Sequence, residues 1–500
     1  MKHKLLAVFL ALVMTLSLLP TAALADELDM SEPIITVTPE NAQDVLDGAS
    51  GSIDGKTIVF SAGDYSQLEL GRATKHAGSN TDYYIGGVAP ENKKSYQDFV
   101  AIKASNEWSA SAYYVRNMSN VTLKAAEGAT VNIAGLVASS GHVYGNVHDY
   151  VLDKQYTVGS AYYLSHNFTN ITIEGIHFTK KVEFATSSAD TVIDGVTFKN
   201  CTFTTEGTAS SNGQGLRYYN ESNNGKVKNL TVDGCTFTNC FQGIYTQKIN
   251  GVTVVNSTFD ITGHNAIAIQ SGSEAVNHKA VVITGNTFEN IGDRIIRFGD
   301  VGADTQITIQ NNTATDSGDS GGEVMKAQSL ADGITYNIYG NKWGAGKTVA
   351  NEQLRDPVAE VNDTKYTTLA AAITAAQTGD TVKLLKDASG NGIQINTSEK
   401  SIIIDLGGYA YTVDGETVGS AGTETNGFQL LKGGSLTIQN GTLATTKARI
   451  MLQNYCNLTL KDVLVDASGS SACDYALSNN CGNVSIIGKT SIKETIPNFV

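Results

Sequence analysis

The 500-residue chain carries a formal net charge of −14, and 17% of its residues are charged, against about 25% in a typical globular protein. A surface this acidic repels nucleic acid and anionic lipid, so a nucleic-acid-binding protein is excluded. Glycine is plentiful, with 50 residues, and proline is scarce, with 6, as expected of many short strands joined by tight turns.

The first 25 residues have the pattern of a secretory signal peptide. Lys2 and Lys4 precede an apolar run at residues 5–19, and the string Ala23-Leu24-Ala25 then precedes Asp26. The apolar run is shorter than the roughly 20 residues that a membrane-spanning helix needs, and no later stretch qualifies as a transmembrane segment. We therefore expect cleavage after Ala25 and a protein that is secreted by a bacterium or displayed on its cell surface.

A short helix is predicted soon after the leader. Thr38 can cap its N-terminus, Pro39 suits its first turn, and Gly48 suits its end. A strand is predicted to follow at residues 57–60. The apolar residues of the helix fall on one face and are Ala42, Val45 and Leu46.

The same order of signals recurs in the last third of the chain. Thr368 is the predicted cap of a helix at residues 369–376, Gly379 is its stop, and a strand follows at residues 381–385. A stack of strands exposes the edge and core of its first layer, and a short amphipathic helix can cover both. Two such helices therefore predict two stacks of strands, with a boundary near residues 350–357.

Between the two predicted helices, one short pattern recurs seven times. It consists of an apolar residue, a Gly or Asn two positions later, and usually an aromatic residue three positions beyond that. Gly and Asn tolerate a left-handed backbone, so each copy predicts a strand, a one-residue bend and a second strand. The copies are Ile173/Gly175/Phe178, Ile193/Gly195/Phe198, Val232/Gly234/Phe237, Val254/Asn256/Phe259, Ile283/Gly285/Phe288, Ile309/Asn311/Ala314 and Ile338/Gly340/Trp343.

These repeats resemble the right-handed parallel β-helix of the pectin-lyase-like superfamily, whose coils turn at a stacked Asn or Gly. The resemblance implies an all-β fold: a right-handed parallel β-helix, or β-solenoid, present twice in tandem, each copy with a short N-terminal capping helix. Coils of this kind stack about 4.8 Å apart. The aromatic residues expected to form one internal column are Phe178, Phe198, Phe237, Phe259 and Phe288.

We divide the chain into a signal peptide at residues 1–25, a first parallel β-helix domain at 26–350, a linker at 351–357 and a second β-helix module at 358–500. The second module resembles modules of multi-module surface proteins of Gram-positive bacteria. No capping signal follows its last corner, so we expect it to be incomplete at its C-terminus. It repeats the corner pattern at Ile438/Asn440/Leu443, Leu460/Asp462/Val465 and Ile486/Gly488.

Hydrolases of this superfamily use two carboxyl groups, one to protonate the leaving oxygen and one to activate water. Their signature of Asn-x-Asp, Asp-Asp, Gly-His-Gly and Arg-x-Lys is absent from this sequence. Asp194 and Asp233 are predicted at equivalent positions of neighbouring coils, but each precedes a corner glycine and is better explained as a turn residue. His264, in the string Thr-Gly-His-Asn, is likewise assigned to an exposed turn.

A lyase is harder to exclude, because β-elimination from a uronate needs only a base and a cation that neutralises the carboxylate. Lys or Arg takes the base role in similar lyases, so the resemblance implies Arg297 and Lys326 as catalytic residues if the protein is a lyase. The alternative is a solvated strand face without a ligand. In register with the repeats, one outward column is expected to hold Arg217, Tyr245, Ala268, Arg297 and Lys326.

The sequence predicts no cofactor and no metal site, with calcium as the alternative. Asp293 and Asp300 flank Arg297 and could supply oxygen ligands, as could the acidic residues of a Gly-rich loop, Asp316, Asp319 and Glu323. No Cys/His cluster has the spacing of a zinc site.

One disulfide is predicted, between Cys201 and Cys240. Each lies three residues beyond a corner aromatic, Phe198 or Phe237, so the two are expected at equivalent positions of adjacent coils. Their Cα atoms would then be about 4.8 Å apart, inside the usual disulfide range of about 4.4–6.8 Å. A ladder of free thiols is the alternative, because each half of the chain holds an odd number of cysteines.

The predicted ligand face is the outward column of Arg217, Tyr245, Arg297 and Lys326. Sugar rings would lie against Tyr245, and the basic side chains would hold carboxylates or sulfates. We favour a secreted or cell-surface β-helix protein that binds a polysaccharide, or a host or cell-wall glycan, or acts in adhesion. A lyase that cleaves acidic polysaccharide by β-elimination is the alternative, and a passive structural spacer is the second alternative.

Overall fold

The computed structural model describes most of the chain in two compact units. The first unit ends at Ala350 and the second begins at Asn351, with residues 338–340 grouped with the second. The predicted signal peptide lies outside the described residues. The described residues are 32–46, 53–70, 73–75, 82–85, 99–104, 112–139, 142–149, 154–186, 192–205, 213–220, 226–272, 278–396 and 400–493.

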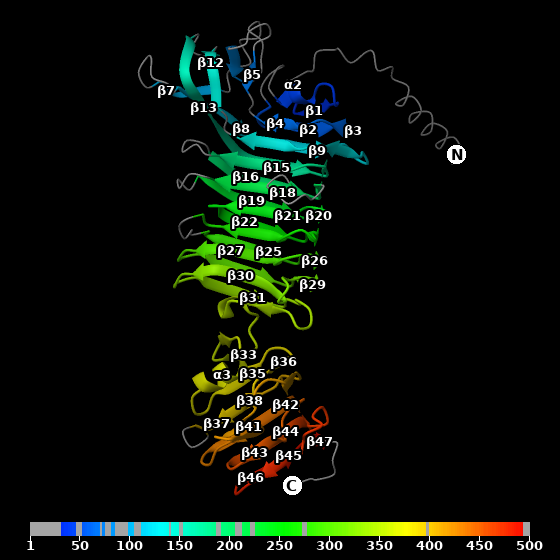
Figure 1. Cartoon of the computed structure of the whole chain (residues 1–500), viewed down its shortest axis with the longest axis vertical. Coiled ribbons are helices and arrows are strands. Elements are labelled where there is room, and N and C mark those ends of the chain that lie inside the picture. The colour runs from blue at the N-terminus through cyan, green and yellow to red at the C-terminus, as the bar shows by residue number, and fades with distance from the viewer. Residues whose placement is uncertain are drawn as a thin grey trace, which may run out of the picture. The chain divides into compact units, whose positions relative to one another are not determined.

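The first unit is a parallel β-helix, in which three strands make one coil and each strand pairs in parallel with its equivalent in the next coil (Figure 1). The first sheet contains β1 (Ile34–Val37), β2 (Thr57–Phe60), β9 (Thr122–Ala125), β13 (Lys154–Glu174), β16 (Val192–Lys199), β19 (Val227–Asp233), β22 (Asn250–Val255), β25 (Ala280–Thr284), β28 (Gln306–Gln310) and β31 (Thr335–Tyr339). The expected fold class is therefore confirmed for this unit.

The other two sheets complete each coil. The second sheet contains β3 (Gly63–Tyr65), β10 (Val131–Ile133), β14 (His177–Phe178), β17 (Thr202–Thr204), β20 (Thr236–Thr238), β23 (Thr258–Asp260), β26 (Thr287–Glu289) and β29 (Thr313–Thr315). The third sheet contains β4 (Leu68–Leu70), β11 (Leu136–Ser139), β15 (Val182–Thr186), β18 (Gln214–Asn220), β21 (Gln242–Gln247), β24 (Ile267–Gln270), β27 (Ile296–Val301), β30 (Glu323–Leu330) and β32 (Thr348–Val349).

Additional strands extend the first sheet on one side. Strand β8 (Ala112–Ser119) pairs in parallel with β13, and β7 (Phe99–Ala104) pairs with β8 in antiparallel. Strand β12 (His142–Asp149) pairs with β13 in antiparallel and in parallel with β6 (Asp82–Ile85), which pairs with β5 (Ala73–Lys75). These insertions interrupt the early coils, which explains why the repeat pattern is weak in this part of the sequence.

The corners adopt the left-handed backbone that the sequence predicts. All ten predicted Gly, Asn and Asp corner positions of the two units have φ between 51° and 75°. At Gly234, a Cβ atom would lie 2.5 Å from Asn200 Oδ1 of the preceding coil, so the close stacking of coils adds to the need for glycine there.

One of the seven predicted copies is out of register by five residues. Gly195 does have a positive φ, but it lies within β16, and Phe198 pairs with Ile173 and Val232 of the first sheet. The corner of this coil is Asn200, and Phe203 takes the place assigned to Phe198. Both Phe198 and Phe203 lie three residues beyond a Gly or Asn, so the local pattern cannot separate them.

Phenylalanine rings fill the core beneath the second sheet. The corrected column runs through Phe178, Phe203, Phe237, Phe259 and Phe288, all of them fully buried. The ring centroids of Phe203 and Phe237 are 4.4 Å apart and those of Phe237 and Phe259 are 4.7 Å apart, with nearly parallel planes. The ring spacing thus follows the spacing of the coils.

The residue that follows each corner forms a second buried ladder. The backbone N–H of each member before the last donates to the side chain of the equivalent residue in the next coil, at 3.4 Å for Cys201 and Cys235 and 3.1 Å for Asn312 and Asn341. A buried N–H group without such a partner would be costly. The members, in order, are Cys201, Cys235, Ser257, Asn286, Asn312 and Asn341.

Both predicted capping helices are present. Helix α2 (Ala42–Leu46) is shorter than predicted, but the three predicted apolar residues are buried. Helix α3 (Leu369–Ala375) begins as predicted, because Thr368 Oγ1 accepts a hydrogen bond from the backbone N–H of Ala371 at 3.1 Å.

The second unit also consists mainly of parallel strands. Its larger sheet contains β33 (Ala359–Val361), β34 (Thr364–Tyr366), β35 (Thr381–Leu384), β36 (Ala388–Gly390), β38 (Ile402–Asp405), β39 (Ala410–Val413), β42 (Ser435–Thr445), β44 (Asn457–Asp466), β46 (Asn483–Ile487) and β47 (Ser491–Lys493). Its smaller sheet contains β37 (Ile393–Ile395), β40 (Val418–Ser420), β41 (Thr423–Leu430), β43 (Ile450–Asn454) and β45 (Tyr475–Asn479). A 3-10 turn, η3 (Glu352–Leu354), precedes them.

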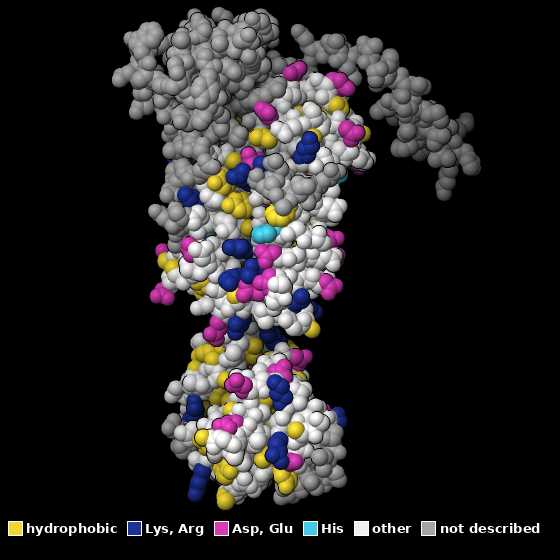
Figure 2. Space-filling model, viewed as in Figure 1, with side chains coloured by type: hydrophobic (Ala, Val, Ile, Leu, Met, Phe, Trp, Pro, Cys, Tyr) yellow, Lys and Arg dark blue, Asp and Glu magenta, His cyan; other side chains and the backbone are white. Residues whose placement is uncertain are grey.

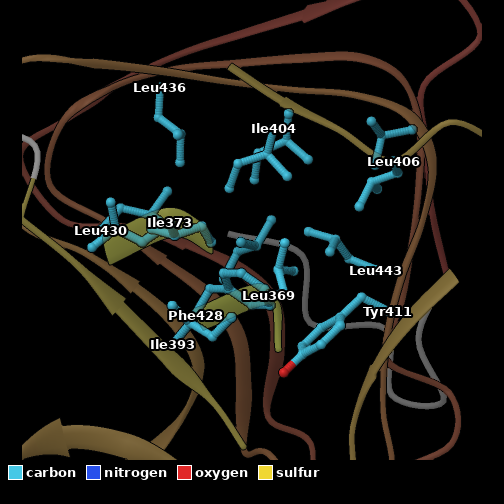
Figure 3. Close-up of a cluster of buried hydrophobic side chains, with 14 of the residues drawn as sticks. Leu369, Ile373, Ile393, Ile404, Leu406, Tyr411, Phe428, Leu430, Leu436 and Leu443 are labelled. Carbon is cyan, nitrogen blue, oxygen red and sulfur yellow. The ribbon is translucent and has the colours of Figure 1, made fainter. Parts of the chain in front are cut away.

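Apolar side chains from both of these sheets and from α3 form one core (Figure 3). Leu369 and Ile373 of α3 point into it, and both are almost fully buried. Ile486 continues the ladder of Leu460 but is 49% exposed.

Candidate functional site

The third sheet carries the candidate site on its outward face. Register pairs Arg217 with Tyr245, Tyr245 with Ala268, Ala268 with Arg297, and Arg297 with Lys326. The structure therefore brings the predicted residues together on consecutive coils. We call Arg217, Tyr245, Arg297 and Lys326 the basic strip. Ala268, which lies between Tyr245 and Arg297, is left out because it is buried.

The Arg217 end of the strip is bound to neighbouring side chains. Glu183, on the preceding coil, lies 3.0 Å from Arg217 and 2.7 Å from Lys181. The guanidinium of Arg217 also lies over the ring of Tyr219, 4.1 Å from its centroid. Tyr219 in turn stacks against Tyr245 with ring centroids 6.2 Å apart. This end thus offers aromatic surface and a cation that already has partners.

The other end of the strip holds the more available positive charge. Arg297 is exposed and makes no ion pair with any residue in the described part of the chain. The side chain of Lys326 is 51% exposed, and its nearest acidic partner, Glu323, is 3.8 Å away. Because the two residues are paired rungs of a parallel ladder, their backbones lie about 4.8 Å apart, and one anionic group can reach both. Figure 2 shows basic and acidic side chains gathered on this face of the first unit.

Sequence reasoning missed Arg294, which joins three carboxylates beside the strip. Its guanidinium lies 3.0 Å from Asp293, 2.9 Å from Asp319 and 2.6 Å from Glu323. Burial alone would lower the pKa of Arg294, but hydrogen bonding to Glu323 and the three negative charges raise it. Asp319 accepts the backbone N–H groups of Glu323 and Gly321, which lower its pKa. Arg294 and Asp319 therefore stay charged near neutral pH.

Most of the acidic residues that the sequence suggested for calcium have protein partners in this structure. Asp293 precedes β27 and is bound to Arg294, whereas Asp300 lies near the end of β27 and accepts a hydrogen bond from Ser329 at 2.6 Å. The two carboxylates therefore do not converge. Within the described residues, no group of three or more His, Cys, Asp or Glu side chains is placed to hold a metal ion. In the Gly-rich loop, a guanidinium takes the position between Asp319 and Glu323.

His264 lies next to this cluster and was assigned only to a turn. Its Nε2 atom is 3.6 Å from Asp293, its Nδ1 atom contacts the Asn265 amide, and its ring packs against Phe241 with centroids 5.2 Å apart. Burial lowers the pKa of His264 and outweighs the opposite effect of the Asp293 carboxylate, with Arg297 and Arg294 adding to the decrease. At neutral pH the imidazole is therefore neutral and can accept a proton.

The predicted Cys201–Cys240 pair is wrong in register. Cys201 lies beside Cys235, because β17 pairs Thr202 with Thr236, and the cysteines of the described chain are free thiols. The prediction relied on Phe198 as the corner aromatic. Because Phe203 holds that position instead, Cys201 is equivalent to Cys235 and not to Cys240.

The same slip affects Asp194 and Asp233. Asp194 pairs in register with Lys228, and Asp233 pairs with Lys199, so the two aspartates belong to different ladders. The side-chain amides of Asn229 and Asn256 donate hydrogen bonds to Asp194 and Asp233, respectively. Asp233 directly precedes the corner Gly234, which agrees with a turn role, whereas Asp194 lies within β16.

Comparison with known proteins identifies the fold of the first unit. Residues 158–342 match the family model described as "Right handed beta helix region". No curated protein matches the chain. Within the described residues, no helix is both long and apolar enough to cross a membrane.

Two solved structures show a weak overall likeness. The structure of Yersinia enterocolitica Family 28 exopolygalacturonase is 12% identical, with 93% of this chain and 78% of that chain covered and a TM-score of 0.24. The structure of a PL6 family alginate lyase is 10% identical, with 92% of this chain and 76% of that chain covered and a TM-score of 0.16. Scores this low do not support the transfer of either activity to this chain.

Proposed function

Because residues 158–342 match the right-handed β-helix family model, we propose that this protein is an exported or cell-surface β-helix that binds an extended acidic glycan along the basic strip. The observation that carries the proposal is the pair of adjacent rungs Arg297 and Lys326. Both are exposed on an otherwise acidic protein, and Arg297 has no ion-pair partner among the described residues.

The geometry of the strip fits a long ligand. Its residues lie on successive coils, so a sugar chain can run parallel to the axis of the β-helix and meet Tyr245 and then the two exposed cations, Arg297 and Lys326. Tyr219 and Tyr245 offer ring faces for stacking, and Arg297 can hold a carboxylate or sulfate through two hydrogen bonds. No deep pocket is needed for such a ligand. The expected binding is weak and sensitive to salt, because the charges are exposed.

The test is binding of fluorescently labelled uronate oligosaccharides at low ionic strength. Changing both Arg297 and Lys326 to Ala should weaken binding about tenfold or more, since each removes a charged hydrogen-bonding partner. The matched control is the pair Lys199→Ala and Lys342→Ala, which removes the same charge from exposed positions outside the third sheet. Equal binding by the two double variants would refute the site.

A lyase is the second candidate, and the pairing of His264 with Asp293 beside Arg297 favours it. A neutral imidazole can take the proton next to a uronate carboxylate while Arg297 neutralises that carboxylate. Incubation with polyuronate, followed by ultraviolet absorbance of unsaturated product, tests this reaction. Binding without product supports the glycan-binding protein, and product that is lost in His264→Gln supports the lyase. A passive spacer would bind nothing on a glycan array.

A further inference from the structure

The first two members of the buried ladder are both cysteines. Cys201 and Cys235 are each 1% exposed, and they stand on adjacent coils immediately before the paired residues Thr202 and Thr236. The backbone N–H of Cys201 donates to Cys235 Sγ at 3.4 Å. The remaining ladder members have hydroxyl or amide side chains, so within the ladder a disulfide can form only between these two residues.

The spacing of the two residues suits a disulfide. Equivalent residues of adjacent parallel strands have Cα atoms about 4.8 Å apart, within the observed range of about 4.4–6.8 Å for disulfides. We propose that Cys201 and Cys235 are an oxidation site, at which a small-molecule disulfide converts the two thiols into a bond between adjacent coils. The two cysteines are 34 residues apart in sequence.

The reaction proceeds by two exchanges. A thiolate attacks the small disulfide and releases one thiol, and the second cysteine then attacks the mixed disulfide and releases the other. Hydrogen bonding to Cys201 lowers the pKa of Cys235, whereas burial raises the pKa of Cys201, so Cys235 is the first attacker. The protein thiols are oxidised and the small disulfide is reduced to two thiols. Because both sulfurs are buried, the reaction requires local opening and is slow.

The disulfide would covalently close the coil that carries Arg217, at one end of the basic strip. Strand β18, with Arg217, lies between the two cysteines in sequence. Linking the two ends of this segment restricts the unfolded chain and stabilises the fold. The inference stands on the ladder alone and does not depend on glycan binding.

The chain supplies matched controls for the test. Serine is a conservative replacement in the ladder, because Ser257 already accepts the backbone N–H of Cys235 at 3.1 Å. Cys235→Ser therefore removes the pair while keeping an acceptor for Cys201. Cys240→Ser removes another buried thiol and leaves the pair intact. Cys481 is exposed and reports whether the oxidant has acted.

The experiment treats the full chain with cystamine, alkylates remaining thiols at low pH, and maps disulfides by mass spectrometry. A linked Cys201–Cys235 peptide is expected in the unmodified protein and in Cys240→Ser, and not in Cys235→Ser. Oxidation should raise the thermal midpoint of the unmodified protein by about 5 °C or more and leave that of Cys235→Ser unchanged.

Three results would overturn the inference. A cystamine adduct on Cys481 without a linked Cys201–Cys235 peptide would show that the pair does not react. A Cys201–Cys240 peptide would contradict the register of the ladder. A linked peptide without a rise in the thermal midpoint would refute the stabilising role of the bond.

Discussion

Asn312 gives the sharpest test of the buried ladder. Its side chain is fully buried and accepts two hydrogen bonds, from the backbone N–H and the amide of Asn286, both at 3.0 Å. It donates two more, to the carbonyl of Ile283 at 2.9 Å and to the amide oxygen of Asn341 at 2.8 Å. The substitution Asn312→Ala removes all four bonds at once.

The expected loss of stability follows from the groups left behind. The backbone N–H of Asn286 loses its partner in the interior, which costs about 1–3 kcal/mol. The removed amide also leaves a small cavity, which adds about 1 kcal/mol. Together these effects predict a decrease of about 2–4 kcal/mol in the free energy of unfolding.

Urea unfolding followed by tryptophan fluorescence measures this change, because Trp343 lies in the next coil, aligned with Ala314. The control is Asn312→Cys, since Cys235 already accepts a backbone N–H at an equivalent position. The cysteine variant should lose clearly less stability than the alanine variant. If the two variants unfold at the same urea concentration, or if Asn312→Ala matches the unmodified protein, the role assigned to the ladder is wrong.

Two further predictions concern the core and its pH dependence. Phe259 is fully buried between two stacked rings, so Phe259→Ala should lower the free energy of unfolding by about 3–5 kcal/mol, and a loss below about 1 kcal/mol in urea unfolding would contradict the aromatic column. Burial lowers the pKa of His278, whose Nε2 atom has no hydrogen-bond partner among the described residues, so the unfolded state binds a proton more readily than the folded state. The free energy of unfolding should therefore fall as the pH drops below about 6.5, and it should fall less steeply in His278→Gln. Thermal unfolding at several pH values measures this, and an equal decrease in the two proteins would contradict the role assigned to His278.

The corners of this fold could be predicted from the sequence because their cause is local. A left-handed backbone excludes most side chains, so a Gly, Asn or Asp at a fixed offset from buried residues marks the bend. The cap at Thr368 is local in the same way, because its side chain reaches a backbone N–H three residues later. The basic strip was also predictable, since buried and outward residues alternate along the strands that carry Arg297 and Lys326.

The register of one coil was decided only by stacking. Phe198 and Phe203 each lie three residues beyond a Gly or Asn and both are buried, so local pattern and hydrophobicity suit either one. The choice depends on which ring meets Phe237 in the next coil, and that contact joins residues far apart in sequence. The incorrect disulfide partner of Cys201 followed directly from this ambiguity.

The charge cluster also depended on tertiary structure. Arg294 is adjacent in sequence only to Asp293, and its contacts with Asp319 and Glu323 arise because the next coil returns 25 to 29 residues later to the same turn. Sequence alone identified the acidic loop but not the cation inside it. Composition and spacing determine how each coil bends, whereas the partner of each charged side chain is set by the stacking of coils, because the intervening loops vary in length.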